Sequence, residues 1–200
     1  MAKQKIPLVL IGGGGHCRAV IDVIEQEKKY EIVKILDLAA YQGQFVVPPY
    51  RITGTDEDIP ALVKKGYHFL ITIGQIKTVS YRENMWEILQ KHEAQMATVI
   101  SPLAYVSRHA KIFEGTIIMH GVFVNTYAMV RENCIINSKA LIEHDALIAK
   151  NCHIATGAII NGNVKVYEGC FIGSNAVVKE GITISAYNII GAGETIRRNI

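Results

Sequence analysis

The second half of the chain repeats its hydrophobic pattern every six residues. From residue 106 to residue 196, every sixth position holds isoleucine or valine without interruption. A period of six fits neither a straight α-helix nor an array of hairpins, and it is typical of a hexapeptide parallel β-helix built from triangular coils. The repeated positions are Val106, Ile112, Ile118, Val124, Val130, Ile136, Ile142, Ile148, Ile154, Ile160, Val166, Ile172, Val178, Ile184, Ile190 and Ile196.

A second, smaller pattern accompanies these residues. The position two residues before each isoleucine or valine is mostly small or apolar, and it holds Cys134, Cys152 and Cys170 in three successive coils. Asparagine is concentrated in this half of the chain, and it tolerates the left-handed backbone angles of tight corners. We therefore expect a prism of about five coils in which the three cysteines stack and pack in a dry core.

The first half of the chain alternates apolar runs with helical patterns. Strands are predicted at residues 8–11, 32–36 and 69–73, and a further one at 97–100, whereas residues 38–54 suggest an irregular loop. Strands separated by helices indicate a small parallel sheet of about four strands with helices on both faces. We place the boundary between an α/β domain and the β-helix at residues 101 and 102, which gives domains 1–101 and 102–200.

Composition and charge exclude several classes of protein. The chain has 21 basic and 18 acidic residues without a basic cluster, so we expect no nucleic-acid partner. No apolar stretch approaches the length that a membrane span needs, and we expect no membrane insertion. The N-terminus lacks the pattern of a secretory signal, and four cysteines in such a chain suggest free thiols; we therefore expect a cytoplasmic protein.

The first predicted strand ends in a glycine-rich loop, Gly12–Gly15, followed by His16. The full dinucleotide fingerprint is absent, because Cys17 or Arg18 stands where a third glycine is required. A glycine turn that opens a helix still presents backbone N–H groups to a phosphate, although the same turn can connect a strand to a helix without any ligand. Asp37, at the end of the second strand, is placed to contact a ribose or base.

The sequence Glu143-His144-Asp145 is the strongest candidate for catalysis. The repeat directs Ile142 inwards, so His144 lies near a corner with a carboxylate on each side. Acyl transfer needs a base that works near neutral pH, and a carboxylate on the other ring nitrogen would fix the tautomer. Spacing alone leaves an equal alternative, an exposed histidine in a charged turn, and it does not decide whether Glu143 or Asp145 orients the ring.

With these motifs, the chain resembles the bacterial sugar acetyltransferases that join a Rossmann-like N-terminal domain to a left-handed β-helix. This group includes the N-acetyltransferases of UDP-linked 4-amino sugars and the sialic acid O-acetyltransferases. The resemblance runs from Leu8 to about Ile196 and is most specific at residues 12–16, 136–145 and 162–164. The left hand of the β-helix comes only from this resemblance, because the general rule for crossovers favours the right hand.

The resemblance implies a role for each candidate site residue. It implies His144 as the general base with Asp145 beside it, and Asn137 as a residue that holds substrate near the base. Contacts with acetyl-CoA are implied for His153 and for backbone groups of later coils, and a corner asparagine or histidine without a ligand is the alternative. The implied nucleotide contacts are Gly14, Gly15, His16, Asp37 and Gly74, and the implied coenzyme contacts are His153, Gly162, Gly173, Ser174, Gly191 and Ala192.

Together these features predict an acetyltransferase that uses acetyl-CoA as co-substrate and no metal. Its expected acceptor is an amino-deoxy sugar linked to a nucleotide, with UDP favoured, and transfer is expected to be direct. The alternatives are O-acetylation of sialic acid or another sugar, and a nucleotide-sugar-binding protein with a degenerate transfer site. Relatives usually continue past the last repeat, whereas this chain ends at Ile200, which gives weight to the last alternative. The flat faces of a triangular prism and the family predict a homotrimer.

Overall fold

The computed structural model describes residues 4–200, which form two compact units. The α/β unit comprises the described residues up to Gly74 together with Ser80–Ala97, and the β-helix unit comprises Gln75–Val79 and Thr98–Ile200. The boundary that we expected between residues 101 and 102 thus lies inside the β-helix unit. Residues 1–3, part of the N-terminus in which we found no secretory signal, lie outside the described residues.

The α/β unit is built on a six-stranded sheet with the order β3-β4-β2-β1-β5-β6. All neighbouring strands are parallel except β3 and β4, which are antiparallel. Parallel strands need crossovers, and helices supply them. The strands are β1 (Ile6–Ile11), β2 (Tyr30–Leu36), β3 (Phe45–Val47), β4 (Tyr50–Gly54), β5 (His68–Ile71) and β6 (Gln95–Met96).

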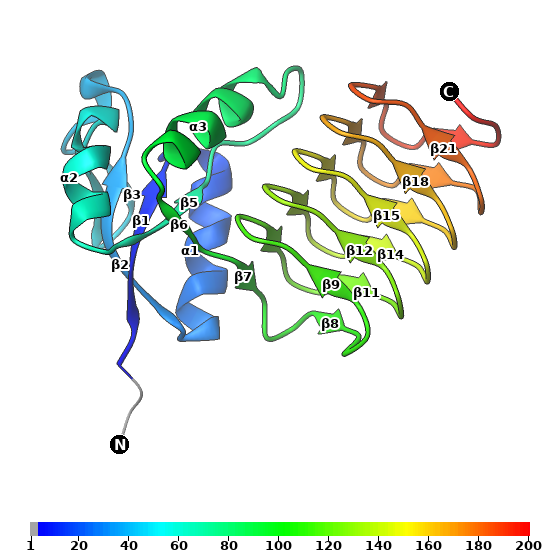
Figure 1. Cartoon of the computed structure of the whole chain (residues 1–200), viewed down its shortest axis with the longest axis horizontal. Coiled ribbons are helices and arrows are strands. Elements are labelled where there is room, and N and C mark those ends of the chain that lie inside the picture. Colours follow the sequence, from blue (N-terminus) through cyan, green and yellow to red (C-terminus); the bar gives the residue numbers. More distant parts are fainter. Residues whose placement is uncertain (1–3) are drawn as a thin grey trace. The chain divides into compact units, whose positions relative to one another are not determined.

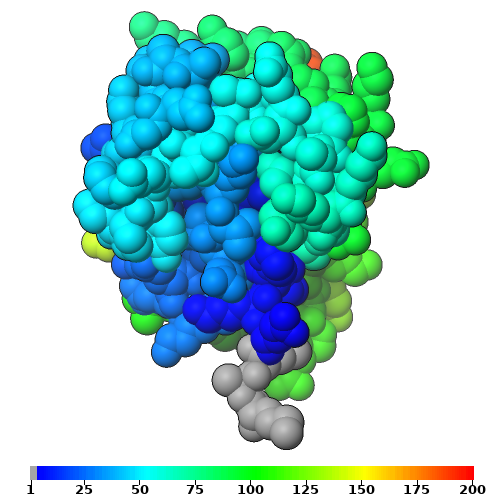
Figure 2. Space-filling model, turned by 90° about the vertical axis from the view of Figure 1, so that its left-hand side faces the viewer, coloured from blue at the N-terminus to red at the C-terminus, as the bar shows by residue number. Residues whose placement is uncertain are grey.

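Helices cover both faces of this sheet, as expected for a βαβ pattern. The chain forms α1 (Gly15–Glu27), α2 (Ile59–Lys64) and α3 (Ser80–Lys91), and the short 3₁₀ turns η1 (Ala39–Tyr41) and η2 (Asp56–Asp58). Alternate residues of β1 point to opposite faces: Val9 and Ile11 pack in one core with residues of α2 and α3. Figure 1 shows α1 and α2 on opposite sides of the strands, and in Figure 2 the segments around residues 50–70 (cyan) form much of the visible α/β surface.

Two local expectations for the α/β unit were wrong. Residues 38–54 are not an irregular loop, because they contain η1, β3 and β4. The strands are short, and Pro48 and Pro49 fall between them, so no long periodic run marks them in the sequence. The strand expected at residues 97–100 is also shorter and lies in another sheet: the last strand of the α/β sheet, β6, ends at Met96, whereas Val99 and Ile100 pair with β10 of the β-helix.

The β-helix unit consists of three parallel sheets formed by two-residue strands. The first sheet contains β7 (Val99–Ile100), β10 (Ile117–Ile118), β13 (Ile135–Ile136), β16 (His153–Ile154), β19 (Phe171–Ile172) and β22 (Ile189–Ile190). The second contains β8 (Tyr105–Val106), β11 (Phe123–Val124), β14 (Leu141–Ile142), β17 (Ile159–Ile160), β20 (Val177–Val178) and β23 (Thr195–Ile196). The third contains β9 (Lys111–Ile112), β12 (Met129–Val130), β15 (Leu147–Ile148), β18 (Lys165–Val166) and β21 (Thr183–Ile184).

The register confirms the expected repeat, because Ile118 pairs with Ile136 and Ile136 with Ile154 in successive coils. Figure 1 shows the strands of each sheet stacked coil upon coil, as in a left-handed β-helix. The second residue of each strand points inwards and is buried in the central coils. We call the turns from the first to the second sheet the first corner, and the turns from the second to the third sheet the second corner.

Residues in the left-handed conformation occur in the turns at all three corners: Asn175 at the first, Asn163 at the second, and Asn133 and Asn151 between the third sheet and the first all have positive φ. The three stacked cysteines are buried, as expected, and each thiol donates to a backbone carbonyl of the next coil. Within residues 4–200, no helix is long and apolar enough to cross a membrane. In the same part of the chain, no group of three or more His, Cys, Asp or Glu side chains could hold a metal ion.

Candidate active site

His144 lies at the second corner, two residues after the end of β14. Its side chain is 61% exposed, and Nδ1 lies 2.9 Å from Oδ2 of Asp145. A carboxylate accepts hydrogen bonds, so Nδ1 carries the proton and Nε2 of the neutral ring presents a lone pair. Asp145 is held in the left-handed conformation (φ 60°), and its N–H donates to the carbonyl of Thr126 on the preceding coil. The coil below therefore helps to fix the residue that orients the ring.

Glu143 has a different contact from Asp145. Its Oε2 accepts the backbone N–H of His144 at 3.1 Å and the side-chain amide of Asn125 at 2.7 Å. Asn125 occupies the equivalent position one coil earlier, so the hydrogen bond runs along the corner. Glu143 thus supports the backbone of the turn, whereas Asp145 contacts the imidazole ring.

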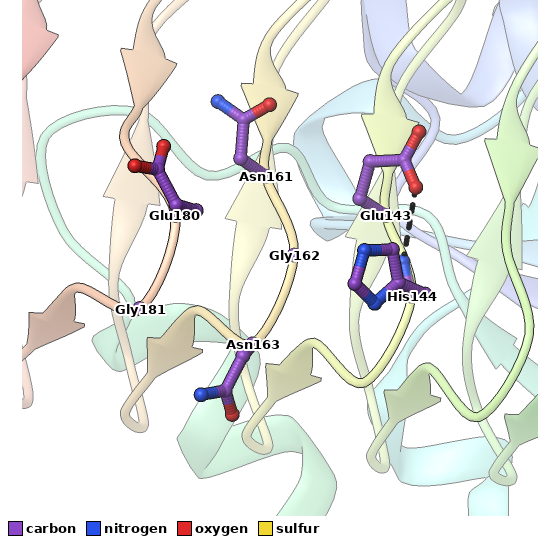
Figure 3. Close-up of a pocket in the computed structure, with 7 residues that line it drawn as sticks. All are labelled: Glu143, His144, Asn161, Gly162, Asn163, Glu180 and Gly181. Carbon is purple, nitrogen blue, oxygen red and sulfur yellow. Dashed lines mark hydrogen bonds between the residues drawn. The ribbon is translucent and has the colours of Figure 1, made fainter.

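Gly162 makes room for the imidazole ring. A Cβ at this position would lie 2.7 Å from both Cε1 and Nε2 of His144, closer than carbon atoms approach in folded proteins. In Figure 3 the ring projects from its own coil towards Gly162 on the next coil. The glycine therefore allows Nε2 to face the pocket rather than be pushed away from it.

The pocket around His144 has a volume of about 610 Å³. It follows the second corner over three coils, and its walls combine carboxylates, amides and glycine backbone (Figure 3). Such a polar groove suits a hydrophilic substrate better than an apolar one. The lining residues are Glu143, His144, Asn161, Gly162, Asn163, Glu180 and Gly181.

Asn137 and His153 form a second cluster, which the structure does not bring into the His144 pocket. Asn137 follows β13 at the first corner, and its Nδ2 lies 3.2 Å from Nε2 of His153 on β16. His153 is only 6% exposed, and its Nδ1 lies 2.5 Å from the carbonyl oxygen of Gln75. The ring is therefore enclosed among protein groups on both of its nitrogen atoms.

The expected coenzyme residues are also divided between the two corners. Gly162 belongs to the second corner with His144, whereas Gly173 and Ser174 stand at the first corner, above Asn137 in later coils. A Cβ on Gly173 would lie 2.6 Å from the backbone of Gly191 and from the N atom of Ala192, so these coils approach closely. The strands of the second sheet run between the two groups.

The glycine loop of the α/β unit has an ordered, open geometry. Gly12 adopts φ 98°, and Gly13 donates its N–H to Oδ2 of Asp37 at 2.6 Å. Asp37 also accepts the N–H of Leu38 through Oδ1, so its carboxylate helps to shape the loop. Gly14 and Gly15 face open space, with no atom within 4 Å of an added Cβ. Their backbone can therefore be approached closely by a ligand.

The remaining predicted residues lie at the same edge of the sheet. α1 begins at Gly15, and no side chain caps its first turn. A Cβ on Gly74, three residues after β5, would lie 3.7 Å from Cβ of His16. The structure thus brings His16, Gly74 and the glycine loop together at the carboxyl ends of the parallel strands, where open α/β sheets bind ligands.

Sequence reasoning missed several residues of these sites. Asn125, Asn161 and Glu180 could have been found by adding or subtracting one coil from Glu143 and Gly162, because equivalent corner positions stack. Gln75 carries no such signal, since it lies between two elements of the α/β unit and contacts His153 across 78 positions of sequence.

Comparisons with known proteins agree with this architecture. Residues 7–89 match the family described as the PglD N-terminal domain. A UDP-N-acetylbacillosamine N-acetyltransferase of Bacillus subtilis is 32% identical over 117 residues. That match covers 56% of this chain and 50% of the relative, so it spans only half of the relative's length.

Solved structures resemble nearly the whole chain. A point mutant of perosamine N-acetyltransferase from Caulobacter crescentus, in complex with CoA and GDP-perosamine, is 28% identical with a TM-score of 0.88, and the match covers 97% of this chain and 90% of that one. The acetyltransferase domain of PglB from Neisseria gonorrhoeae, in complex with acetyl coenzyme A, is 25% identical with a TM-score of 0.90 over 98% and 93% of the two chains. Residues 7–89 thus match the PglD N-terminal domain, and nearly the whole chain is similar in fold to solved bacterial sugar N-acetyltransferases.

Proposed function

We propose that this protein transfers the acetyl group of acetyl-CoA to the amino group of a nucleotide-linked amino-deoxy sugar. The observation that carries the proposal is the His144–Asp145 pair, which leaves Nε2 as a proton acceptor over Gly162 in an open polar pocket. The Bacillus and Caulobacter relatives are named for the N-acetylation of amino sugars.

The reaction that this geometry supports is direct transfer. The sugar amine attacks the thioester carbonyl, and Nε2 of His144 takes the proton that the nitrogen loses. The C–S bond then breaks, and the proton passes from the imidazolium to the leaving thiolate. Asp145 stabilises the imidazolium through Nδ1–H, as a carboxylate does in a catalytic triad. The four cysteines are buried, so none of them is offered as a nucleophile.

The coenzyme is proposed to bind along the corners of the β-helix. Gly162 lies beside His144, whereas Gly173, Ser174 and Ala192 line the later coils of the first corner. Asn137 lies at the same corner in an earlier coil, and His153 projects from β16 of the first sheet next to it. A backbone N–H at such a corner would suit the oxyanion that forms on the thioester carbonyl.

A homotrimer would unite residues that a single chain keeps apart. The outward residues of the second sheet form an apolar ladder between the two corners: Tyr105, Phe123, Leu141, Ile159 and Val177. Tyr105 and Phe123 stack at 4.7 Å between ring centroids and are both exposed. If a second copy covers this face, the first corner of one chain approaches the second corner of its neighbour.

The glycine loop is proposed to hold the nucleotide. The N–H groups at the start of α1 would bind the diphosphate, with His16 and Gly74 beside it and Asp37 directed to the ribose or base. We favour UDP, and the Caulobacter relative, which binds GDP-perosamine, makes GDP the nucleotide to compare.

The first prediction tests the base. His144→Ala should lower the rate of acetyl transfer by about 10²–10⁴-fold, because the proton acceptor is lost. Release of free thiol from acetyl-CoA would be followed with UDP- and GDP-linked amino sugars, amino sugars and sialic acids. Binding of the nucleotide, measured by calorimetry, should remain as in the parent protein.

Three results would contradict the proposal in different ways. Transfer to hydroxyl groups alone would identify an O-acetyltransferase, and nucleotide binding without transfer would identify a binding protein. Equal transfer by His144→Ala and the parent would remove His144 as the base.

A further inference from the structure

The segment Gln75–Val79 belongs to the β-helix unit although it interrupts the α/β unit in sequence. Gln75 anchors it: the side chain is buried, with the residue 2% exposed. Its Nε2 lies 3.1 Å from the carbonyl oxygen of Asn151 and 3.3 Å from that of Cys170. A primary amide has two N–H donors, so one side chain joins two successive coils.

The backbone carbonyl of Gln75 makes the next contact. It lies 2.5 Å from Nδ1 of His153, which projects outwards from the first sheet. A carbonyl oxygen only accepts hydrogen bonds, so Nδ1 of His153 carries the proton. The ring is also packed edge-on against Phe171, with 5.2 Å between the ring centroids. Its orientation is therefore fixed by both polar and apolar contacts.

The other ring nitrogen determines how Asn137 is oriented. With the proton on Nδ1, Nε2 of the neutral ring is an acceptor, and Nδ2 of Asn137 donates to it at 3.2 Å. Oδ1 of Asn137 accepts the N–H of Ser138 at 2.8 Å, which fixes the two ends of the amide. One N–H of the Asn137 amide remains for a ligand, whereas both nitrogen atoms of His153 are engaged within the protein.

We propose that Gln75 is a positioning residue that fixes the tautomer of His153 and, through it, aims the amide of Asn137. In this arrangement His153 does not donate a hydrogen bond to the thioester, and Asn137 supplies the N–H donor on this side of the site. The proposal deepens the proposed function and rests on it for the identity of the ligand. The tautomer of His153 and the positioning role of Gln75 do not depend on the proposed function.

Packing alone does not explain a glutamine at this position. Oε1 of Gln75 is buried with no hydrogen-bond partner, which costs free energy that an apolar side chain would not lose. The two donors of Nε2 are used, however, and they hold the backbone carbonyl against His153. The polar side chain is thus explained by the position of the carbonyl that it secures.

The tautomer is tested by NMR of protein labelled with ¹⁵N in histidine. In the parent, His153 should show a protonated Nδ1 and an unprotonated Nε2. Gln75→Met, of similar size but without donors, and Gln75→Glu, which places acceptors against two carbonyls, should both produce exchange between tautomers. Ile76→Ala is the matched control from the same segment, because Ile76 is 66% exposed, and it should leave the spectrum unchanged. A proton on Nε2 of His153 in the parent would overturn the proposal.

Kinetics provide the second measurement. Both Gln75 variants should lower kcat by about tenfold or more, since a small displacement of a positioned group is costly, while Ile76→Ala retains the parent rate. Parent tautomer and parent kcat in both Gln75 variants would overturn the positioning role. If the parent acetylates no amino sugar, the proposed function fails, but the NMR of parent and variants still decides the role of Gln75.

Discussion

At the scale of single residues, the contact between His144 and Gly162 determines where the imidazole ring lies in the site. Gly162 lies outside the left-handed region, so alanine is permitted by the backbone but not by the imidazole ring. We expect Gly162→Ala to displace the ring and lower the transfer rate by about 10–100-fold. The thermal midpoint should change little, because the ring is exposed and can move into solvent.

A double-mutant cycle provides the control for this prediction. In the His144→Ala background the ring is absent, and the added methyl group of Gly162→Ala meets no obstacle from it. The second substitution should then have little further effect on either stability or residual transfer. An equal loss of rate in both backgrounds would mean that Gly162 acts through the coenzyme instead of through the ring.

At the scale of elements, His68 at the start of β5 should make the α/β unit sensitive to acid. Burial, together with the positive charge of Lys29, lowers the pKa of His68 below its ordinary value. The unfolded chain therefore binds a proton more readily than the folded one, and stability should fall as the pH drops below about 6.5. Urea denaturation at pH 7 and pH 5 measures this loss, and His68→Gln should reduce it. An unchanged pH dependence in the variant would assign the effect to other groups.

The strands of the β-helix permit a second test at this scale. Ile148 on β15 is fully buried, and a cavity there can collapse only slightly within a closed coil. Ile148→Ala should lower the free energy of unfolding by about 2–5 kcal/mol, and Ile148→Val by about 0.5–1.5 kcal/mol. Chemical denaturation of both variants provides the comparison. If Ile148→Ala and Ile148→Val lowered the free energy of unfolding equally, packing along the coil axis would not be the main source of stability.

At the scale of the whole molecule, the β-helix was predictable because one simple rule acts at every coil. An inward isoleucine or valine such as Ile136 faces the same environment as Ile154, and one register satisfies the entire stack. The corner position of His144 was predictable for the same reason, whereas the repeat did not decide between Glu143 and Asp145 as the partner of its ring. The contact of Gln75 with His153 was not predictable, because the two residues lie far apart in sequence and no periodic pattern joins them. The short strands β3 and β4 were missed because their sheet partners, not their own periodicity, define them.

The four thiols permit a test of how the two units open. Burial raises the pKa of Cys17 to about 11 in the α/β unit, and burial also raises the pKa of Cys152 in the β-helix unit. The contact with Cys152 lowers the pKa of Cys170, but all four thiols are buried and out of reach of a reagent. Iodoacetamide at pH 8 should therefore modify none of the four cysteines in the native protein and all of them in denaturant. Mass spectrometry of peptides would then measure the rate at each position during partial denaturation.

The pattern of these rates distinguishes two modes of unfolding. Cys134, Cys152 and Cys170 form one continuous stack, so opening of any coil that exposes Cys152 also removes the cover of its neighbours. We expect these three thiols to become reactive together, whereas Cys17 should follow the opening of the α/β unit at its own denaturant concentration. A Cys17→Ala variant should leave the labelling of the β-helix cysteines unchanged. If Cys134 reacts long before Cys170, the β-helix instead unravels coil by coil, as the nearest-neighbour coupling of a repeat protein permits when its interfaces differ in strength.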